Sequence, residues 1–299
     1  MAELAGRKLP SFFAVGPGRT GSTWLHRVLT GHAGLPHGIK ETNFFSTNHR
    51  RSLDWYCALF DGYPSTMPIG EVCPEYFNHP LARGRIAAMI PRARITFTFR
   101  DPVERLYSHY KVLIHYGMTK ASFAEAVADL NNLRHRDIFE ASRYAHHLRE
   151  WLGLFARERM LVMLYEDLKA DPQAYLDHFC DFIGASRFRL DGATAGKRVF
   201  ALERVPLSRR LARNARHLRF GLMARGAYRT VSLLERLGFW RVFTLGGKPF
   251  PPLDRELDER LRQQFAPEVE ELEKMIGRDL SAWKRSRAER ATLQRRAAG

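Results

Sequence analysis

A short apolar strand that runs through a glycine-rich turn into a helix restricts the fold of this chain more than any other feature. Residues 11–15 (SFFAV) are apolar, residues 16–24 read GPGRTGSTW, and a helical pattern, LHRVLTG, follows. Glycines let a backbone approach an anion closely, and a helix N-terminus adds unpaired N–H groups and the positive end of its dipole. The turn therefore predicts a phosphate or sulfate site, with an ordinary Ser/Thr-capped turn as the plainer alternative.

Two further apolar segments have the length of buried strands. Residues 95–99 (ITFTF) and 160–164 (MLVML) are each followed by a stretch compatible with a helix. Short apolar strands that alternate with helices are typical of a parallel sheet, because parallel strands need crossover connections. With 299 residues and no internal repeat, the chain is expected to form one α/β domain over residues 1–299, with a central parallel sheet flanked by helices.

The C-terminal part of the chain differs in composition, since it is rich in arginine. No acidic residue occurs from Arg204 to Leu234, where eight arginines recur, so we expect an arginine-rich helical segment at about 200–235. Apolar residues at helical spacing, followed by Gly277, predict a helix at about 254–276. The arginine-rich segment can be a solvated helix face, the rim of a site for an anionic acceptor, or a contact with a membrane surface.

The net charge of +16 indicates an anionic partner, which a nucleotide, an acidic glycan, a nucleic acid or a membrane surface would each satisfy. No secretory signal and no apolar run long enough to span a bilayer is evident. The three scattered cysteines fit a reducing compartment, so we expect a soluble, cytoplasmic protein. Neither cysteines nor histidines show metal-ligand spacing, and no metal is expected.

Two nucleotide-binding loops compete for residues 16–24. A Walker A motif requires G-x-x-x-x-G-K-[ST], which the chain lacks. Gly16, Gly18 and Gly21 do satisfy G-x-G-x-x-G, and Glu41 lies about 20 residues beyond, as in a dinucleotide-binding Rossmann fold. A Rossmann acid should end a second hydrophobic strand, however, and residues 35–40 (LPHGIK) contain proline, glycine and few apolar side chains. A Rossmann NAD(P) oxidoreductase is therefore a weak alternative.

Four groups of residues resemble the motifs of sulfotransferases that use PAPS (3′-phosphoadenosine 5′-phosphosulfate). GRTGSTW at 18–24 is similar to the family's 5′-phosphosulfate loop, and ITFTFRDPVERLYSHY at 95–110 is similar to its 3′-phosphate motif. LYEDLKADP at 164–172 is similar to its Y-E-D-L segment. KETNFF at 40–45, DWY at 54–56 and GEVCPEYF at 70–77 resemble elements of the heparan sulfate sulfotransferase branch and its bacterial relatives. The resemblance implies a three-layer, P-loop-like sulfotransferase fold.

The resemblance also implies which residues bind the donor. Arg100 and Ser108 are expected to bind its 3′-phosphate, since a guanidinium fork and a hydroxyl both suit phosphate oxygens, and Tyr165 is expected near the adenine. Lys197 and Arg198 are the nearest candidates for the family's late K-G-R loop. The residues expected to form the loop around the donor are Arg19, Thr20, Gly21, Ser22, Thr23 and Trp24.

Glu41 is the expected catalytic base, because the glutamate of K-E-x-x-F-F has that role in the heparan sulfate branch. An acceptor hydroxyl loses a proton as it attacks sulfur, and Phe44 and Phe45 can partly desolvate the carboxylate that takes this proton. Arg19 is expected to stabilise charge on the leaving nucleotide. His109 and His115 are alternative bases.

The chain departs from the branch at two positions: the usual lysine and serine after Gly-Glu are Val72 and Cys73. Lys40 or Arg19 can take the place of the missing lysine, or the acceptor can differ from a sulfated polysaccharide.

The predicted reaction transfers a sulfuryl group from PAPS to a hydroxyl or amine of a carbohydrate or small-molecule acceptor and releases PAP. A glycan, a lipid-linked sugar and a natural product all fit as acceptors. The alternative from another class is a basic protein whose loop grips a nucleic-acid backbone or an anionic membrane. The chain lacks a recognised nucleic-acid-binding signature, so a specific nucleic acid is not expected, whereas a peripheral membrane contact stays open.

Overall fold

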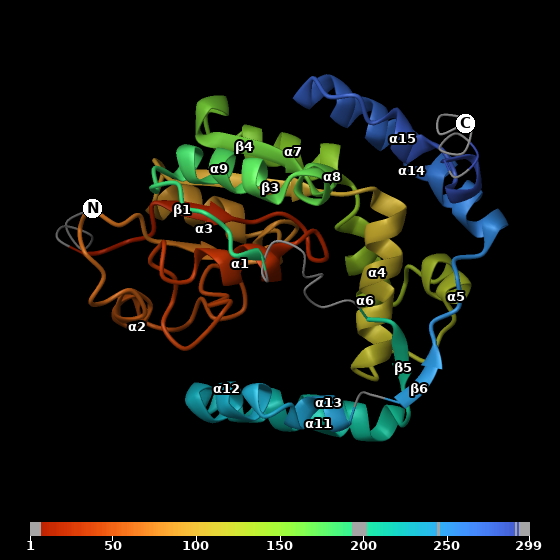
Figure 1. Cartoon of the computed structure of the whole chain (residues 1–299), viewed down its shortest axis with the longest axis horizontal. Coiled ribbons are helices and arrows are strands. Elements are labelled where there is room, and N and C mark those ends of the chain that lie inside the picture. Colours follow the sequence, from red (N-terminus) through yellow and green to blue (C-terminus); the bar gives the residue numbers. More distant parts are fainter. Residues whose placement is uncertain (1–6, 193–201, 244–245, 291, 293–299) are drawn as a thin grey trace. The chain divides into compact units, whose positions relative to one another are not determined.

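The computed structural model describes residues 7–192, 202–243, 246–290 and 292, in two units (Figure 1). The first unit comprises the chain up to Arg100 together with residues 147–200. The second comprises residues 101–146 together with the chain from residue 201. Each unit has a hydrophobic core of its own. The organisation as a single domain stays a prediction.

A parallel sheet of four strands forms the centre of the first unit, in the order β2-β1-β3-β4. The central strand β1 pairs with β2 and β3, and β3 also pairs with β4. The apolar segments 11–15, 95–99 and 160–164 supply β1, β3 and β4 as predicted, whereas β2 contains a carboxylate and no apolar run that would predict a strand. The strands are β1 (Phe12–Ala14), β2 (Gly70–Val72), β3 (Arg94–Phe99) and β4 (Met160–Leu164).

Side chains of the strands alternate between the two faces of the sheet, and both faces are covered. On one face, Phe12 packs edge-on against Phe179 of α9 (Pro172–Ile183), with ring centroids 6.0 Å apart, in a core that also contains α1 (Ser22–Leu29). On the other face, Phe97 packs against Trp151 of α7 (Tyr144–Leu152) at 5.7 Å. Helices on both sides of a parallel sheet confirm the predicted three-layer α/β fold.

Within the first unit, helices come after the carboxyl ends of β1 and β4 along the chain. The segment after β1 leads into α1, and α8 (Tyr165–Ala170) begins where β4 ends. Carboxyl ends of parallel strands lie at the same edge of a sheet, so the first turns of both helices are brought to that edge. The remaining short elements of the first unit are α2 (Leu53–Ala58), the 3-10 turn η2 (Pro74–Tyr76), α3 (Ala82–Met89) and the 3-10 turn η3 (Arg157–Arg159).

The second unit consists of helices and a small antiparallel pair of strands. Its α4 (Pro102–His115) begins where Asp101 Oδ1 accepts hydrogen bonds from the N–H groups of Val103 and Glu104. No helix in the described ranges is both long and apolar enough to cross a membrane. The other elements are α5 (Phe123–Ala128), α6 (Leu133–Glu140), β5 (Arg204–Pro206), α11 (Arg209–Ala224), α12 (Tyr228–Arg236), α13 (Phe239–Val242), β6 (Gly246–Pro249), α14 (Arg255–Ile276) and α15 (Ser281–Lys284).

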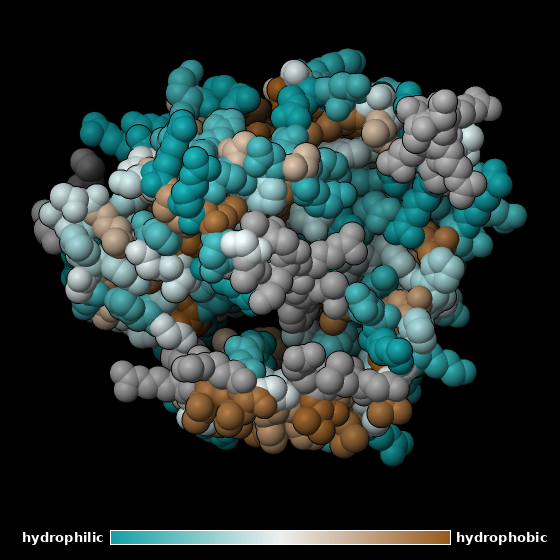
Figure 2. All heavy atoms as spheres, viewed as in Figure 1, coloured by the Kyte–Doolittle hydropathy of each residue, from teal (hydrophilic) through white to brown (hydrophobic). Residues whose placement is uncertain are grey.

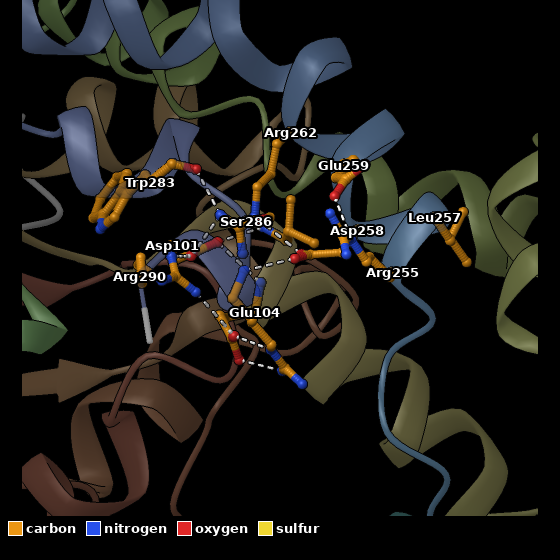
Figure 3. A network of polar contacts seen from close by, with 12 residues as sticks. Asp101, Glu104, Arg255, Leu257, Asp258, Glu259, Arg262, Trp283, Ser286 and Arg290 are labelled. Atoms are coloured by element: carbon orange, nitrogen blue, oxygen red, sulfur yellow. Dashed lines mark hydrogen bonds and ion pairs between the residues drawn. The ribbon is translucent and has the colours of Figure 1, made fainter. Parts of the chain in front are cut away.

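A buried network of charges joins the start of α4 to the C-terminal helices (Figure 3). Asp101 Oδ2 accepts from Arg262 Nη1 at 2.9 Å and from Arg290 Nη1 at 2.6 Å. Arg262 also donates to Asp258 Oδ1 at 3.0 Å and to the carbonyl of Trp283 at 2.6 Å. The side chains of Asp101, Asp258 and Arg262 are at most 4% exposed, so each charge is compensated by its partners and not by water.

Candidate functional site

The glycine-rich turn between β1 and α1 has the backbone of an anion-binding loop. A Cβ atom on Gly16 would lie 2.5 Å from the backbone nitrogen of Thr98, and Gly21 has a φ of 102°, so neither position accepts a side chain without strain. Gly21 caps α1 without a side-chain hydrogen bond, and the first turn of α1, which starts at half-buried Ser22, contains no acidic residue. These N–H groups and the positive end of the helix dipole therefore suit an anion.

Two side chains shape the turn before Gly21. Arg19 has a left-handed φ of 79°, a conformation that a non-glycine residue adopts only when its surroundings hold it there. The buried Thr20 hydroxyl donates to the carbonyl of Pro17 at 2.8 Å and closes the turn. The loop is therefore held in this shape by its own contacts.

Arg100 and Tyr165, which follow β3 and β4, meet the turn. Arg100 Nη1 donates to the carbonyl of Arg19 at 3.4 Å, and the Arg100 guanidinium lies over the Tyr165 ring, 4.9 Å from its centroid. A Cβ atom on Gly21 would lie 3.6 Å from Tyr165 Cδ2. Residues that the sequence singled out in three separate motifs are therefore neighbours in the structure.

Lys40 places Glu41 beside the same loop. Its Nζ donates to Glu41 Oε1 at 2.6 Å and to Thr23 Oγ1, in the first turn of α1, at 3.2 Å. The side chains of Lys40 and Glu41 are 33% and 34% exposed, so both can be reached from solvent. Burial, and then the charge of Lys40, lower the pKa of His26 on α1 to about 4, so this imidazole is neutral near pH 7.

A buried carboxylate fixes the segment that follows Glu41. Glu71, at the middle of β2, accepts hydrogen bonds from the hydroxyls of Tyr56, of Thr42 at 2.7 Å and of Tyr76 at 3.2 Å. Burial raises the pKa of Glu71 to about 7, although the three hydroxyl donors oppose that rise. Since Thr42 is the next residue after Glu41, this network positions the backbone on which Glu41 is carried.

The sequence alone predicts no role for Glu71, which appears there only as a residue of the GEVCPEYF motif. The signal that could have singled it out is an acidic residue within residues 69–73 (IGEVC), whose other members are uncharged, with tyrosines at positions 56 and 76. Acidic residues are almost never fully buried unless they are paired.

The two positions at which the chain departs from the family motif are buried. Val72 is fully buried in the core that contains α1 and α9. The Cys73 thiol, also fully buried, donates to Asn43 Oδ1 at 3.3 Å. Position 72 therefore offers no cation, and Lys40 is the cation that lies beside Glu41.

Trp24 and Ser108, which are also predicted to contact the nucleotide, both lie on helices. Trp24 is 5% exposed and packs edge-on against Tyr175 at 6.0 Å, in the core between α1 and α9. Ser108 lies on the second turn of α4 and belongs to the second unit. Their contacts with a nucleotide stay predictions.

The remaining predicted residues lie on α4 or beyond the described ranges. His109 and His115 are half-buried on α4, and Arg105 Nη1 lies 3.2 Å from His109 Nδ1. Lys197 and Arg198 lie outside the described residues.

One further cluster has the residue types of a metal site. His147 Nδ1 lies 3.5 Å from Glu150 Oε2, one turn along α7. Arg83 Nη2 lies 2.7 Å from the same carboxylate oxygen. Because this guanidinium compensates the carboxylate, the cluster gives no reason to assign a metal.

Comparison with known families adds an independent finding to this geometry. Residues 9–193, more than half of the chain, match the sulfotransferase domain. The chain belongs to the sulfotransferase family. The matched range includes all four strands of the sheet, the loop, Glu41, Arg100 and Tyr165. The Rossmann alternative is therefore wrong, and the structure agrees, since Glu41 lies in a loop and not at the end of a second strand.

The sulfotransferase is similar to the bifunctional heparan sulfate N-deacetylase/N-sulfotransferases. It is 28% identical over 198 residues to enzyme 1 of Caenorhabditis elegans and 28% identical over 200 residues to enzyme 2 of Homo sapiens. These alignments cover 61% and 60% of the chain but only 23% and 22% of the relatives. The chain thus corresponds to less than a quarter of their length.

A solved structure agrees over a longer range. The sulfotransferase from Alicyclobacillus acidocaldarius superimposes with a TM-score of 0.66 and 26% identity. The superposition covers 93% of this chain and 100% of that one. Since it extends well past residue 193, the likeness includes elements of the second unit as well as the sheet.

The buried Glu71 predicts a pH dependence of stability. Its pKa is about 7 in the folded protein and 4.5 without burial, so the folded state binds more protons between these values. The free energy of unfolding should therefore fall by about 3 kcal/mol as the pH rises from 4.5 through 7, and then level off. We expect Glu71→Gln to remove most of this fall, as measured by urea unfolding at about pH 5 and about pH 8. Glu75→Gln, an exposed neighbour, is the control, and a profile that Glu71→Gln leaves unaltered would contradict the assignment.

Proposed function

We propose that this sulfotransferase transfers a sulfuryl group from PAPS to a hydroxyl or amine and releases PAP. The observation that supports this most is the position of Lys40, whose ammonium contacts both Thr23 in the anion-binding turn and the Glu41 carboxylate. Attack by the acceptor and departure of the nucleotide occur at one sulfur atom, so the base and the donor-binding loop must be neighbours. That requirement is met within the first unit.

The proposed reaction is an in-line displacement. The acceptor oxygen or nitrogen forms a bond to sulfur while the bond between sulfur and the 5′-phosphate oxygen breaks, and the electron pair of the breaking bond stays on that oxygen of PAP. Glu41 takes the proton that the acceptor loses. Arg19 and the N–H groups at the start of α1 stabilise the charge that develops on the leaving oxygen. Lys40 keeps Glu41 beside the loop and adds positive charge that the family motif supplies from position 72.

The rest of the donor is assigned to residues after β3 and β4. Arg100 binds the 3′-phosphate and Tyr165 lies beside the adenine, in keeping with the contact between these two side chains. Ser108 is a second ligand of the 3′-phosphate, and Lys197 and Arg198 are further candidates. A cytoplasmic location stays a prediction.

The acceptor is proposed by class. The relatives are named for sulfation of heparan sulfate nitrogen, so an amino-sugar glycan is the first acceptor to test, followed by lipid-linked sugars and natural products. The valine at position 72 is a reason to include acceptors that differ from sulfated polysaccharides.

Calorimetry with PAP tests the donor assignment. Arg100→Ala should weaken PAP binding by about 10–100-fold, because it removes a charge-assisted contact to phosphate. The affinity for 5′-AMP, which lacks the 3′-phosphate, should stay within about threefold. Arg92→Ala, at an exposed position just before β3, is the control.

Three results would contradict the donor assignment. They are no binding of PAP, an equal loss of affinity for PAP and 5′-AMP in Arg100→Ala, or nucleic-acid binding that falls with salt and is not competed by PAP.

A further inference from the structure

The segment α11–α13 exposes an unusual number of large apolar side chains. Of the exposed large hydrophobic residues in the described part of the chain, only Leu81, Leu133 and Leu154 lie elsewhere. Figure 2 shows hydrophobic residues gathered over this segment, at the lower edge of the view. We call residues 207–242 the α11–α13 surface. Its exposed apolar members, between 36% and 76% exposed, are Leu207, Leu211, Leu218, Phe220, Leu233, Leu237, Phe239 and Val242.

Isolated exposed leucines are normal on a protein, but a gathered set marks a binding surface. The two most exposed members, Leu207 at 76% and Val242 at 75%, lie near opposite ends of the segment, so the exposed apolar side chains are not confined to one helix. Leu233 on α12 and Leu237, the residue that caps the C-terminal end of α12, are 55% and 72% exposed and lie about one turn apart.

The same segment carries positive charge with little to balance it. No acidic residue occurs from Arg204 to Leu234, and Arg209, Arg210 and Arg213 are exposed on α11. Burial, and then repulsion from Arg134 and Arg213, lower the pKa of Arg216, as expected for a guanidinium among like charges. One counter-charge is present, since Arg219 pairs with Glu235 at 2.7 Å. The α11–α13 surface thus exposes both apolar and cationic side chains.

Exposed apolar side chains together with positive charge favour some classes of binding partner over others. A nucleic acid offers phosphates but little for exposed leucines to enter, and a second copy of the same surface would bring arginines against arginines. A bilayer with anionic lipids offers phosphates to the guanidinium groups in its headgroup layer and hydrocarbon to the apolar side chains just below that layer. We propose that the α11–α13 surface binds a membrane rich in anionic phospholipids, with its leucines and phenylalanine rings in the interfacial layer.

Co-sedimentation with vesicles tests the proposal. The full chain should bind vesicles of equal parts phosphatidylcholine and phosphatidylglycerol, bind phosphatidylcholine alone far more weakly, and release as salt is raised. The triple variant Arg209→Gln, Arg210→Gln, Arg213→Gln should lose about 100-fold in affinity for the anionic vesicles.

A second variant separates the apolar contribution from the charge. The double variant Leu233→Ser, Leu237→Ser should lose about tenfold in affinity, since two partly exposed leucines no longer enter the bilayer. The double variant Leu81→Ser, Leu133→Ser is the matched control, because these leucines are 55% and 68% exposed and lie outside the surface. Circular dichroism of each variant checks that it is folded.

Four outcomes would overturn the proposal. They are no binding to either vesicle, equal binding to both, equal losses in the Leu233/Leu237 variant and in its control, or self-association in light scattering that the Leu233/Leu237 variant abolishes while vesicle binding is unaffected. The test needs no sulfuryl donor, so its failure would leave the proposed activity standing.

Discussion

Glu41→Gln is expected to lower the rate of sulfuryl transfer by about 10²–10⁴-fold and to leave PAP affinity nearly unchanged. Glutamine has almost the size of glutamate, and its carbonyl oxygen can still accept a hydrogen bond from Lys40. Its amide cannot take the acceptor's proton, however, so only the chemical step is lost. Turnover with labelled PAPS and calorimetry with PAP measure the two quantities separately.

Glu158→Gln provides the control for this variant, because Glu158 is an exposed residue of η3 in the same unit. It should change neither turnover nor PAP affinity. A Glu41→Gln protein with unreduced turnover would refute the assignment of the base, and variants of His109 and His115 would be tested next. A loss that lies wholly in PAP affinity would make Glu41 a donor-binding residue instead.

Arg262→Met should lower the free energy of unfolding by about 3–5 kcal/mol. The guanidinium contacts Asp101 at 2.9 Å and Asp258 at 3.0 Å, and both carboxylates are 4% exposed. Methionine fills similar space but removes one guanidinium from Asp258 and from Asp101, which keeps its ion pair with Arg290 (Figure 3). Chemical unfolding, followed by circular dichroism, measures the change.

An exposed pair on the same helix is the matched control. Arg255 contacts Glu259 at 2.9 Å with the same spacing of four residues, but its side chain is 76% exposed. Arg255→Met should therefore change the free energy of unfolding far less than Arg262→Met does. If the two variants were equally stable, the buried network would contribute nothing beyond an exposed ion pair.

Three of the strands and the glycine-rich loop could be predicted from the sequence because their signals are local. A buried parallel strand needs a short apolar run, and a backbone that approaches an anion closely needs glycine. Residues 11–24 contain both signals, so they predict a strand followed by an anion-binding turn. The same holds for β3 and β4. The approach of Arg19, Arg100 and Tyr165 follows from the parallel sheet itself, since each comes after the carboxyl end of a strand.

Other features depend on contacts between distant residues. Strand β2 is only three residues long and contains Glu71, whose burial is tolerated because three hydroxyls from other segments bind it. The position of Asp101 just before α4 is typical of a helix cap. Its ion-pair partners Arg262 and Arg290 lie 161 and 189 residues further along the chain, so local sequence does not indicate them. The sequence places Trp24 in the predicted loop around the donor. In the structure, the side of α1 that carries Trp24 faces α9, so Trp24 packs in the core.

The burial of position 72 has a consequence for attempts to redirect this enzyme to another acceptor. Val72 is a core residue that shares its strand with the Glu71 network, so restoring a lysine there would put an ammonium group among apolar side chains. We therefore expect Val72→Lys to destabilise the strand. A lysine at position 72 would also require changes in the apolar side chains that surround it. Attempts to change the acceptor should instead begin at Lys40, which is 33% exposed and lies beside Glu41.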